Sequence, residues 1–523
     1  MVVLSMLPPK RWAICLGGVF LFMLFLQFLL VSEPLAPFLV RFPNATRFLA
    51  FVLFAAVFLF VWSFLCLFPL FVSRNNFPSI WRRLFALLIS LHSFFSLSAV
   101  FKKLVLPHHY HSHSVFWTLC SVCLVSNCFI LFAAVLVEGS AFLLSLLCRW
   151  WCHSKRDTHN SYIIESSKRL RTGLILFLVS VLLVHALHEA TRLPPKVVIV
   201  EVDIPGLPWQ ADGFTILQLS DVHLLAAPSG SGLWSYDHKK AFVEWILRFV
   251  DSEQWQDMLL FATEDNPAIE DNAAAETKQR KKEVGLVALT GDLVDGSVEE
   301  VGSLVAELVQ QIPNQHGVFF VPGNHEYHQP PGGHFQRDWM PFFRSVGIRS
   351  LLNDAVIIST TGNDDCEGGG QEEKEEQLFV LAGVDDYAAV KSGGEGPNLT
   401  MALNAVGASG SHLPIVLLAH RPQMVYEAAE KGAALQLSGH THGGQIFPMH
   451  FLLWLVDPHL AGLYREPHPR DRSASNDPYD LPAIRSSTTL YVSSGATYGD
   501  PPLRFLASSE IALFILRSPH GNP

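Results

Sequence analysis

The chain has 523 residues, half of them hydrophobic, and a formal net charge of −10 at pH 7. This length is too great for one ordinary domain. Residues 1–196 hold 17 Lys and Arg against 5 Asp and Glu, a net of +12, so the remaining residues carry −22. The strongly acidic C-terminal half argues against nucleic acid as a partner, because phosphate backbones bind basic surfaces.

Five apolar stretches occupy the N-terminal third, and most of them approach the ~20 residues that a helix needs to cross a bilayer. The third and the fifth are short and contain a histidine, so an interfacial or core helix is the alternative for each. We expect all five to cross, which makes residues 1–190 a multi-pass α-helical membrane region. The stretches are residues 12–31, 48–72, 84–100, 115–137 and 173–187.

Basic residues are unevenly divided between the loops that flank these stretches. Eleven Lys and Arg lie on the side of the N-terminus and four lie on the other side. The positive-inside rule then predicts a cytoplasmic N-terminus, and five crossings put the C-terminal half in a lumen or outside the cell. The sequon Asn398-Leu399-Thr400 agrees with that side. If one short stretch does not cross, the side inverts.

The C-terminal half alternates between short apolar runs and helical periodicity, as over residues 237–250. We expect a linker and first strand over residues 191–211, then a layered α/β domain over residues 212–517. Three polar segments, 251–283, 361–376 and 465–487, are predicted to be mobile surface loops because they can bury little. The expected strands are 197–202, 214–219, 284–289, 318–321, 356–359, 378–381, 414–419, 435–437, 489–492 and 511–516.

Polar residues follow five of these apolar runs. A single Asp or His at a strand end is more often a cap or a turn residue. Five in succession point to ligands, because buried polar groups are costly unless they are paired or coordinated. The segments are Asp221-Val222-His223, GDLVD from Gly291 to Asp295, GNHE from Gly323 to Glu326, His420, and GHTH from Gly439 to His442.

The ordered series DVH, GDLVD, GNHE, a lone His and GHTH resembles the calcineurin-like metallophosphoesterase superfamily across residues 212–517. The GGQ after GHTH, Gly462-Leu463-Tyr464, LYVSSG and PPLRF resemble its membrane-associated branch, which includes bacterial phosphodiesterases acting on lipid precursors. The resemblance implies a β-sandwich of two sheets flanked by helices, with two divalent metal ions at one edge.

The resemblance also implies a ligand set. One metal would be held by Asp221, His223, Asp292 and His442, and the other by Asp292, Asn324, His420 and His440. Carboxylate, imidazole and amide ligands without thiolate suit Mn, Fe or Zn. Two such cations ~3.5–4 Å apart would share a hydroxide that attacks phosphorus.

Four more residues have expected roles at this site. In the family, the histidine at the position of His325 faces the substrate, where it would protonate the leaving group. Asp295 resembles the carboxylate that hydrogen-bonds this histidine, with a helix N-cap as the alternative. Arg421 and Arg504 are candidates for binding the substrate phosphate, although a solvated or capping arginine is the alternative for each.

The sequence therefore predicts a membrane-anchored dimetal phosphoesterase that hydrolyses a phosphomonoester or a phosphodiester. The alternative is a non-catalytic metal-binding scaffold or membrane-binding module on the same fold, which the complete ligand set disfavours. The apolar run 446–456 directly follows the GHTH turn. It is either a buried strand pair or a wall for acyl chains, and on the second interpretation a lipid phosphoester is the substrate class.

Overall fold

The computed structural model describes residues 129, 130, 137, 140, 161–225, 234–263, 283–328, 334–360, 376–410, 412–447, 449–454, 457–467, 487–499 and 502–519. The chain divides into two units, one of Met1–Leu104 with Cys123–Ile175 and one of Val105–Val122 with Leu176–Pro523. All the strands that the structure describes belong to the second unit.

A 31-residue helix, α6 (Ser161–Thr191), contains the fifth apolar stretch. Among the described residues, its segment Gly173–Thr191 alone is long and apolar enough to cross a membrane. Phe177 and Val184 on this segment are largely exposed. The other four expected crossings lie outside the described residues, apart from Phe129, Ile130 and Val137.

The first sheet has six strands in the order β1-β12-β2-β3-β4-β5. Strands β2 to β5 run parallel to one another, while β12 is antiparallel to β2 and parallel to β1. The strands are β1 (Lys196–Asp203), β2 (Phe214–Leu219), β3 (Leu286–Thr290), β4 (Val318–Val321), β5 (Ile348–Ser350) and β12 (Glu510–Arg517).

The second sheet also has six strands, in the order β10-β11-β9-β8-β7-β6. Its four central strands are parallel, and both edge strands are antiparallel to their neighbours. The strands are β6 (Asp354–Ser359), β7 (Gln377–Gly383), β8 (Ile415–Leu418), β9 (Leu435–Ser438), β10 (Gly462–Pro467) and β11 (Ser487–Val492).

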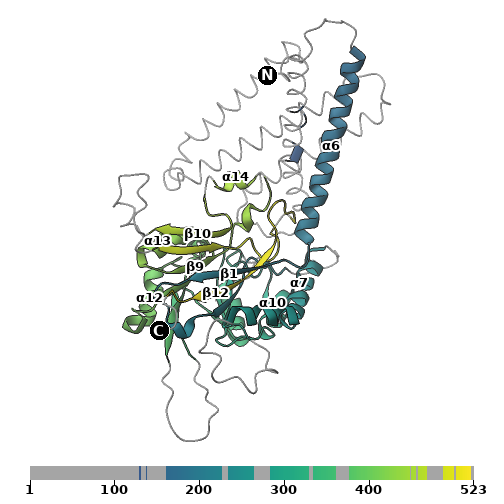
Figure 1. Cartoon of the computed structure of the whole chain (residues 1–523). Coiled ribbons are helices and arrows are strands. Elements are labelled where there is room, and N and C mark those ends of the chain that lie inside the picture. The colour runs from purple at the N-terminus through teal and green to yellow at the C-terminus, as the bar shows by residue number, and fades with distance from the viewer. Residues whose placement is uncertain are drawn as a thin grey trace, which may run out of the picture. The chain divides into compact units, whose positions relative to one another are not determined.

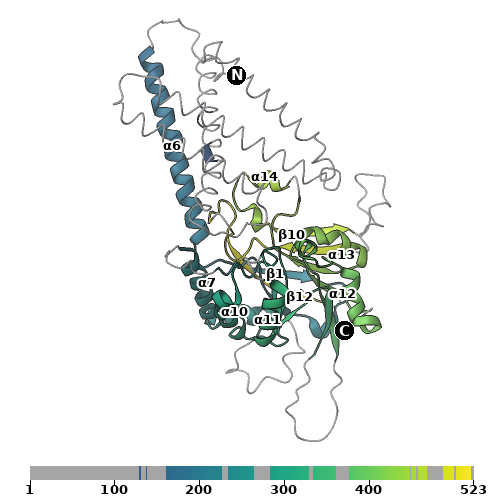
Figure 2. The same ribbon diagram turned by 180° about the vertical axis from the view of Figure 1, so that it is seen from behind.

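The two sheets pack face to face over one apolar core, to which Ile216 and Phe319 contribute from the first sheet and Phe379 and Leu437 from the second. Helices cover the outer faces, as Figures 1 and 2 show for α7 and α10 on one side and α12 and α13 on the other. The expected two-sheet sandwich flanked by helices is therefore confirmed. The helices are α7 (Trp234–Val250), α8 (Glu253–Thr263), α10 (Val298–Gln310), α11 (Met340–Ser345), α12 (Leu399–Val406), α13 (Val425–Lys431) and α14 (Met449–Trp454).

The segment 251–283, expected to be a mobile loop, differs from that expectation at its start. Residues 253–263 form α8, and the buried side chains of Trp255 and Leu259 join the core beneath α7. These two residues are four apart, so they lie on one face of the helix. The helix was not predicted, because the rest of the segment is charged and rich in alanine and dominates its composition. Strands β5 and β10 were also missed, because β5 has three residues and β10 is a partly exposed edge strand.

Candidate metal centre

The polar residues predicted as ligands converge from both sheets. Asp221, Asp292 and Asn324 follow β2, β3 and β4 of the first sheet, while His420 and His440 follow β8 and β9 of the second. Strands β2, β3 and β4 run parallel to one another, as do β8 and β9, so within each sheet the carboxyl ends of these strands lie along one edge. The two edges are joined where Asp221 accepts a hydrogen bond from the backbone N of His440 at 3.1 Å.

One group of candidate ligands consists of Asp221, His223 and His442, all buried. Nε2 of His442 lies 3.1 Å from Nε2 of His223 and 3.4 Å from Oδ1 of Asp221. Three potential donor atoms thus face one point, which is the arrangement that a metal ion requires.

A second group consists of Asp292, His420 and His440. Nε2 of His420 lies 3.3 Å from Oδ2 of Asp292 and 3.2 Å from Nδ1 of His440. The same Oδ2 atom is 3.9 Å from Nε2 of His223, a member of the first group. The carboxylate of Asp292 therefore lies between the two groups.

Asn324 offers a further sign that a cation fits here. Its Oδ1 is buried and has no hydrogen-bond partner among the described residues. A buried acceptor without a donor is unfavourable by ~1–3 kcal/mol, and coordination to a cation would remove that cost. The orphaned amide oxygen and the facing imidazole nitrogens together fit a metal site.

The backbone at these positions is strained. Asp221, His223, Asp292, His440 and His442 all have φ between 50° and 72°. This left-handed conformation costs a residue with a side chain roughly 1–2 kcal/mol and persists where the surroundings enforce it, commonly at functional sites. Five residues with this conformation lie in one cluster, a pattern that is common at functional sites.

Glycines let the two sheets approach closely at this edge. A Cβ at Gly439 would overlap Oγ of Ser220 and Oδ2 of Asp221. Gly443, just after the two histidines of the GHTH turn, has φ of 60°. These glycines therefore allow the turn to lie against the first sheet.

A layer of hydrogen bonds orients the candidate ligands. Nδ1 of His420 is 2.8 Å from the carbonyl oxygen of Thr290, and Nδ1 of His223 is 3.0 Å from Oδ2 of Asp295. Both contacts leave Nε2 directed toward the cluster, because a neutral imidazole that donates from Nδ1 is a ligand through Nε2.

Glu326 supports the loops that carry Asp292 and Asn324. Its buried carboxylate accepts hydrogen bonds from the backbone N of Asp292, Leu293, Val294 and Gly323 at 2.6–3.2 Å. Burial, together with the nearby charge of Asp292, raises the pKa of Glu326 to about 7. Its role is to hold these loops in place and not to bind the metal.

His325 stands at the edge of the cluster, and its side chain keeps 15% of its surface exposed. Its Nδ1 is 2.6 Å from Oδ1 of Asp295, and its Nε2 is 4.0 Å from Oδ2 of Asp292. Burial alone would raise the pKa of Asp295, but the charges of His325 and His223 hold that pKa well below its ordinary value. Asp295 thus stays ionised beside His325.

Arg421 lies at the rim next to the second group. Its Nε and Nη2 donate to the two carboxylate oxygens of Asp386 at 2.7 and 3.1 Å, and its Nη1 is 3.3 Å from Nε2 of His440. The Arg421 side chain is 24% exposed, while Asp386 is buried. Asp386 was not singled out from the sequence, where it is one of two adjacent aspartates after an apolar run.

Arg504 lies behind His442 and not at the rim, so its position does not favour the expected contact with the substrate. Its side chain is completely buried, with Nη2 at 3.1 Å from Nδ1 of His442. The guanidinium donates to the backbone oxygens of Ser494 at 2.7 Å and Ala507 at 3.1 Å, and also to that of Thr497. Arg504 therefore supports the loop behind His442.

Lys239 could not be identified from the sequence, and the structure shows that its side chain is buried. Its Nζ donates to the backbone oxygens of Val222 at 3.2 Å and Tyr498 at 2.8 Å, and to Oγ1 of Thr497. Burial lowers the pKa of Lys239 to about 7. A lysine on an amphipathic helix is normally expected to face solvent. The structure shows instead that Lys239 holds the loop that carries Asp221 and His223.

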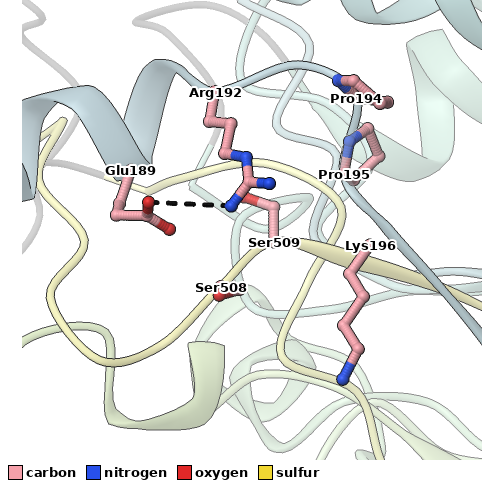
Figure 3. A pocket seen from close by; sticks show the side chains of 7 residues that line it. All are labelled: Glu189, Arg192, Pro194, Pro195, Lys196, Ser508 and Ser509. Carbon is pink, nitrogen blue, oxygen red and sulfur yellow. Dashed lines mark ion pairs between the residues drawn. The ribbon is translucent and has the colours of Figure 1, made fainter.

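A cavity of about 240 Å³ lies at the end of α6, away from these residues. It contains none of the candidate metal ligands, and in Figure 3 an ion pair between Arg192 and Glu189 lies along its wall. The candidate metal centre therefore lies outside this cavity. Its lining consists of Glu189, Arg192, Pro194, Pro195, Lys196, Ser508 and Ser509.

Comparison with known proteins agrees with the geometry. Residues 214–444 match the family model described as calcineurin-like phosphoesterase. Proteins named "transmembrane protein with metallophosphoesterase domain" match from Danio rerio, at 28% identity over 68% of this chain and 64% of theirs, and from Bos taurus, at 30% over 67% and 63%. An uncharacterized metallophosphoesterase of Helicobacter pylori matches at 37% identity over 44% of this chain and 51% of its own. The chain thus spans about half to two thirds of the length of these relatives.

Proposed function

We propose that this chain, whose residues 214–444 form a calcineurin-like phosphoesterase domain, is a membrane-anchored enzyme that uses two divalent metal ions to hydrolyse a phosphoester. The observation that carries the proposal is the position of Asp292. Its Oδ2 lies 3.3 Å from Nε2 of His420 and 3.9 Å from Nε2 of His223, so one carboxylate can serve two cations.

Seven residues would hold the metals. Asp221, His223, Asp292 and His442 would bind one ion, and Asp292, Asn324, His420 and His440 the other. This donor set suits Mn, Fe or Zn. When bound, a metal pair supplies a hydroxide nucleophile at neutral pH and neutralises the developing charge on the phosphoryl oxygens.

His325 is the proposed general acid. Asp295 accepts a hydrogen bond from Nδ1 of His325, which stabilises the protonated imidazole. Nε2 of His325 lies 4.0 Å from Oδ2 of Asp292, and the His325 side chain is 15% exposed, so it can reach a bound substrate. In this role Nε2 gives its proton to the departing alkoxide oxygen, which is otherwise a poor leaving group.

Arg421 is proposed to bind a non-bridging phosphate oxygen. Its two hydrogen bonds to Asp386 fix the guanidinium plane at the rim, beside His440. An arginine held in this way contributes a cation with little loss of side-chain entropy on binding. Asp386 is thus a positioning residue for Arg421.

The non-catalytic scaffold is the weaker alternative. A metal-binding scaffold would share the orphaned Oδ1 of Asn324 and the five strained residues, because these features require only a bound cation. It would have no use for a partly exposed His325 held by a buried carboxylate. The position of His325 is therefore the feature that favours an enzyme over a scaffold.

The substrate class that we favour is a lipid phosphoester, hydrolysed as a monoester or a diester. Two relatives carry "transmembrane" in their names, and α6 is long and apolar enough to span a bilayer. The run 446–456 after the metal-binding turn is not a strand pair over its described part, since Met449–Trp454 form the helix α14. Trp454 on α14 is exposed, as expected for a residue beside an acyl-chain path.

The test uses full-length protein purified in detergent. Metal content would be measured by mass spectrometry, and turnover would be measured with nitrophenyl monoester and diester substrates. We expect two transition-metal ions per chain, and Asp292→Ala should lose metal together with activity. Asp257→Ala, which removes an exposed carboxylate on α8, is the matched control and should retain both. Full metal occupancy in Asp292→Ala would contradict the bridging role.

A further inference from the structure

The helix α6 directly contacts the loop that supports the metal centre. The backbone N of Arg504 donates to the carbonyl oxygen of Ala186 at 2.8 Å. The ring of the next residue, Phe505, meets His185 edge-on, with centroids 5.7 Å apart. The loop around residue 505 is therefore held against the last turns of the candidate membrane span.

The depth of this contact can be estimated from helix geometry. Ala186 precedes the end of α6, Thr191, by five residues, which is about 7.5 Å of helix at ~1.5 Å per residue. Interfacial helices bury their apolar face ~5–10 Å into the headgroup region. If α6 spans the bilayer as proposed, the loop at residue 505 lies at this depth.

Basic residues follow the C-terminal end of α6. Arg192 and Lys196 follow Thr191, and both side chains line the open cavity at the end of α6 (Figure 3). Basic side chains next to a span are typical of the membrane–water boundary.

Apolar side chains are exposed at the same end of the domain. Leu506 is 67% exposed and has φ of 59°, a strained backbone for a leucine. Trp454, the last residue of α14, is 56% exposed. In both Figure 1 and Figure 2, α14 lies at the end of the domain from which α6 rises. We call Trp454 and Leu506, together with the half-buried Leu453, the α14 surface.

The α14 surface is tied to the contact with α6. Phe447 donates from its backbone N to the oxygen of Phe505 at 3.0 Å, and Phe505 donates to the oxygen of Gln445 at 2.9 Å. These bonds join the segment entering α14 to the residue before Leu506. Both parts of the surface are thus anchored to the loop that touches Ala186.

We propose that the α14 surface inserts into the leaflet from which α6 emerges, forming a second membrane contact. The proposal rests on the proposed membrane anchoring through α6. Lipid is the occupant, because the surface lies level with the end of an apolar span and contains a tryptophan, which favours the interface. The contact would also hold the metal centre at the bilayer, since α14 begins seven residues after His442.

The experiment is photolabelling of full-length protein in phosphatidylcholine vesicles that contain a phosphatidylcholine with a diazirine in its acyl chain. Adducts would be located by peptide mass spectrometry. We expect labelling of Leu453, Trp454 and Leu506 several-fold above that of Met401. Met401 is the matched control, because it is 49% exposed on α12, far from α14 in Figure 1.

Phe177 and Val184, exposed on α6, report whether the helix itself is in lipid. Labelling of α6 with only background labelling of the α14 surface would overturn the proposal. Equal labelling of Met401 would overturn it as well, and so would the absence of label on α6, because the proposal requires α6 in the same leaflet. The readout requires no turnover, so the Asp292→Ala variant should give the same pattern. Failure of the proposed catalytic function is thereby separated from failure of this inference.

Discussion

Nδ1 of His325 lies 2.6 Å from Oδ1 of Asp295. The other oxygen of the same carboxylate is 3.0 Å from Nδ1 of His223, a candidate metal ligand. One buried aspartate therefore orients both the proposed general acid and part of the proposed metal centre. The two roles can be separated by experiment.

His325→Ala should retain both metals and lose turnover by about 10²–10⁴-fold on an alkyl phosphoester, because the leaving alkoxide is no longer protonated. The loss should be much smaller with nitrophenolate, which departs without a proton. Metal analysis and turnover with both substrates check this prediction. An equal loss of turnover on substrates with good and poor leaving groups would contradict the assignment of His325 as the general acid.

Asp295→Asn should act on both partners. The amide no longer stabilises protonated His325, so turnover falls, and it orients His223 less well. Loss of such a supporting carboxylate typically weakens metal affinity by ~10–100-fold. Titration with a metal chelator measures the second effect. Unchanged metal affinity would mean that Asp295 serves His325 alone.

A double-mutant cycle provides the control for this pair. With His325 already replaced by alanine, Asp295→Asn should lower turnover much less than in the parent protein, because the residue that it assists is gone. Its effect on metal affinity should persist. Additive losses of turnover would contradict the coupling between the two residues.

Apolar runs made most of this fold predictable. The runs at 214–219 and 318–321 coincide with β2 and β4, because buried central strands are continuous apolar segments. The polar residues that follow β2, β3, β4, β8 and β9 could be chosen as candidates because parallel strands collect their ends at one edge. At that edge the structure groups Asp221 with His223 and His442, and Asp292 with His420 and His440, while Oδ1 of Asn324 is buried. That these residues bind metal stays a prediction.

The residues that support the loops of the candidate metal centre through long-range contacts could not be predicted. Lys239 and Thr497 are 258 positions apart in the sequence, yet Nζ of Lys239 donates hydrogen bonds to Oγ1 of Thr497 and to the backbone oxygen of Val222. Arg504 has a sequence context that suits a phosphate-binding residue, yet the fold buries it behind His442. Composition reports whether a residue is charged, but only packing decides whether that charge faces the substrate or the interior.

Arg504→Gln should destabilise the loop behind His442 and weaken metal binding. The carbonyl oxygens of Ser494, Thr497 and Ala507 would lose their donors, and an unsatisfied buried group costs ~1–3 kcal/mol. We expect a lower Tm and a metal affinity reduced by ~10–100-fold, with KM unchanged at saturating metal. A raised KM with unchanged metal affinity would instead support a substrate contact.

Arg421→Gln should have the opposite profile. Its guanidinium is partly exposed and bound to Asp386, so its removal should leave metal content intact and raise KM for the phosphoester. A lost charge-assisted hydrogen bond of ~1.5–3 kcal/mol corresponds to a loss of roughly 10–150-fold in kcat/KM.

Asp386→Asn should reproduce a smaller part of the loss of kcat/KM, because Arg421 remains but the plane of its guanidinium is no longer fixed. Arg421→Lys keeps the charge without the two-pronged geometry and should fall between the wild type and Arg421→Gln. If kcat/KM is the same in Arg421→Gln and the wild type while metal content is unchanged, Arg421 does not contact the substrate, and its pairing with Asp386 serves only the packing of the rim.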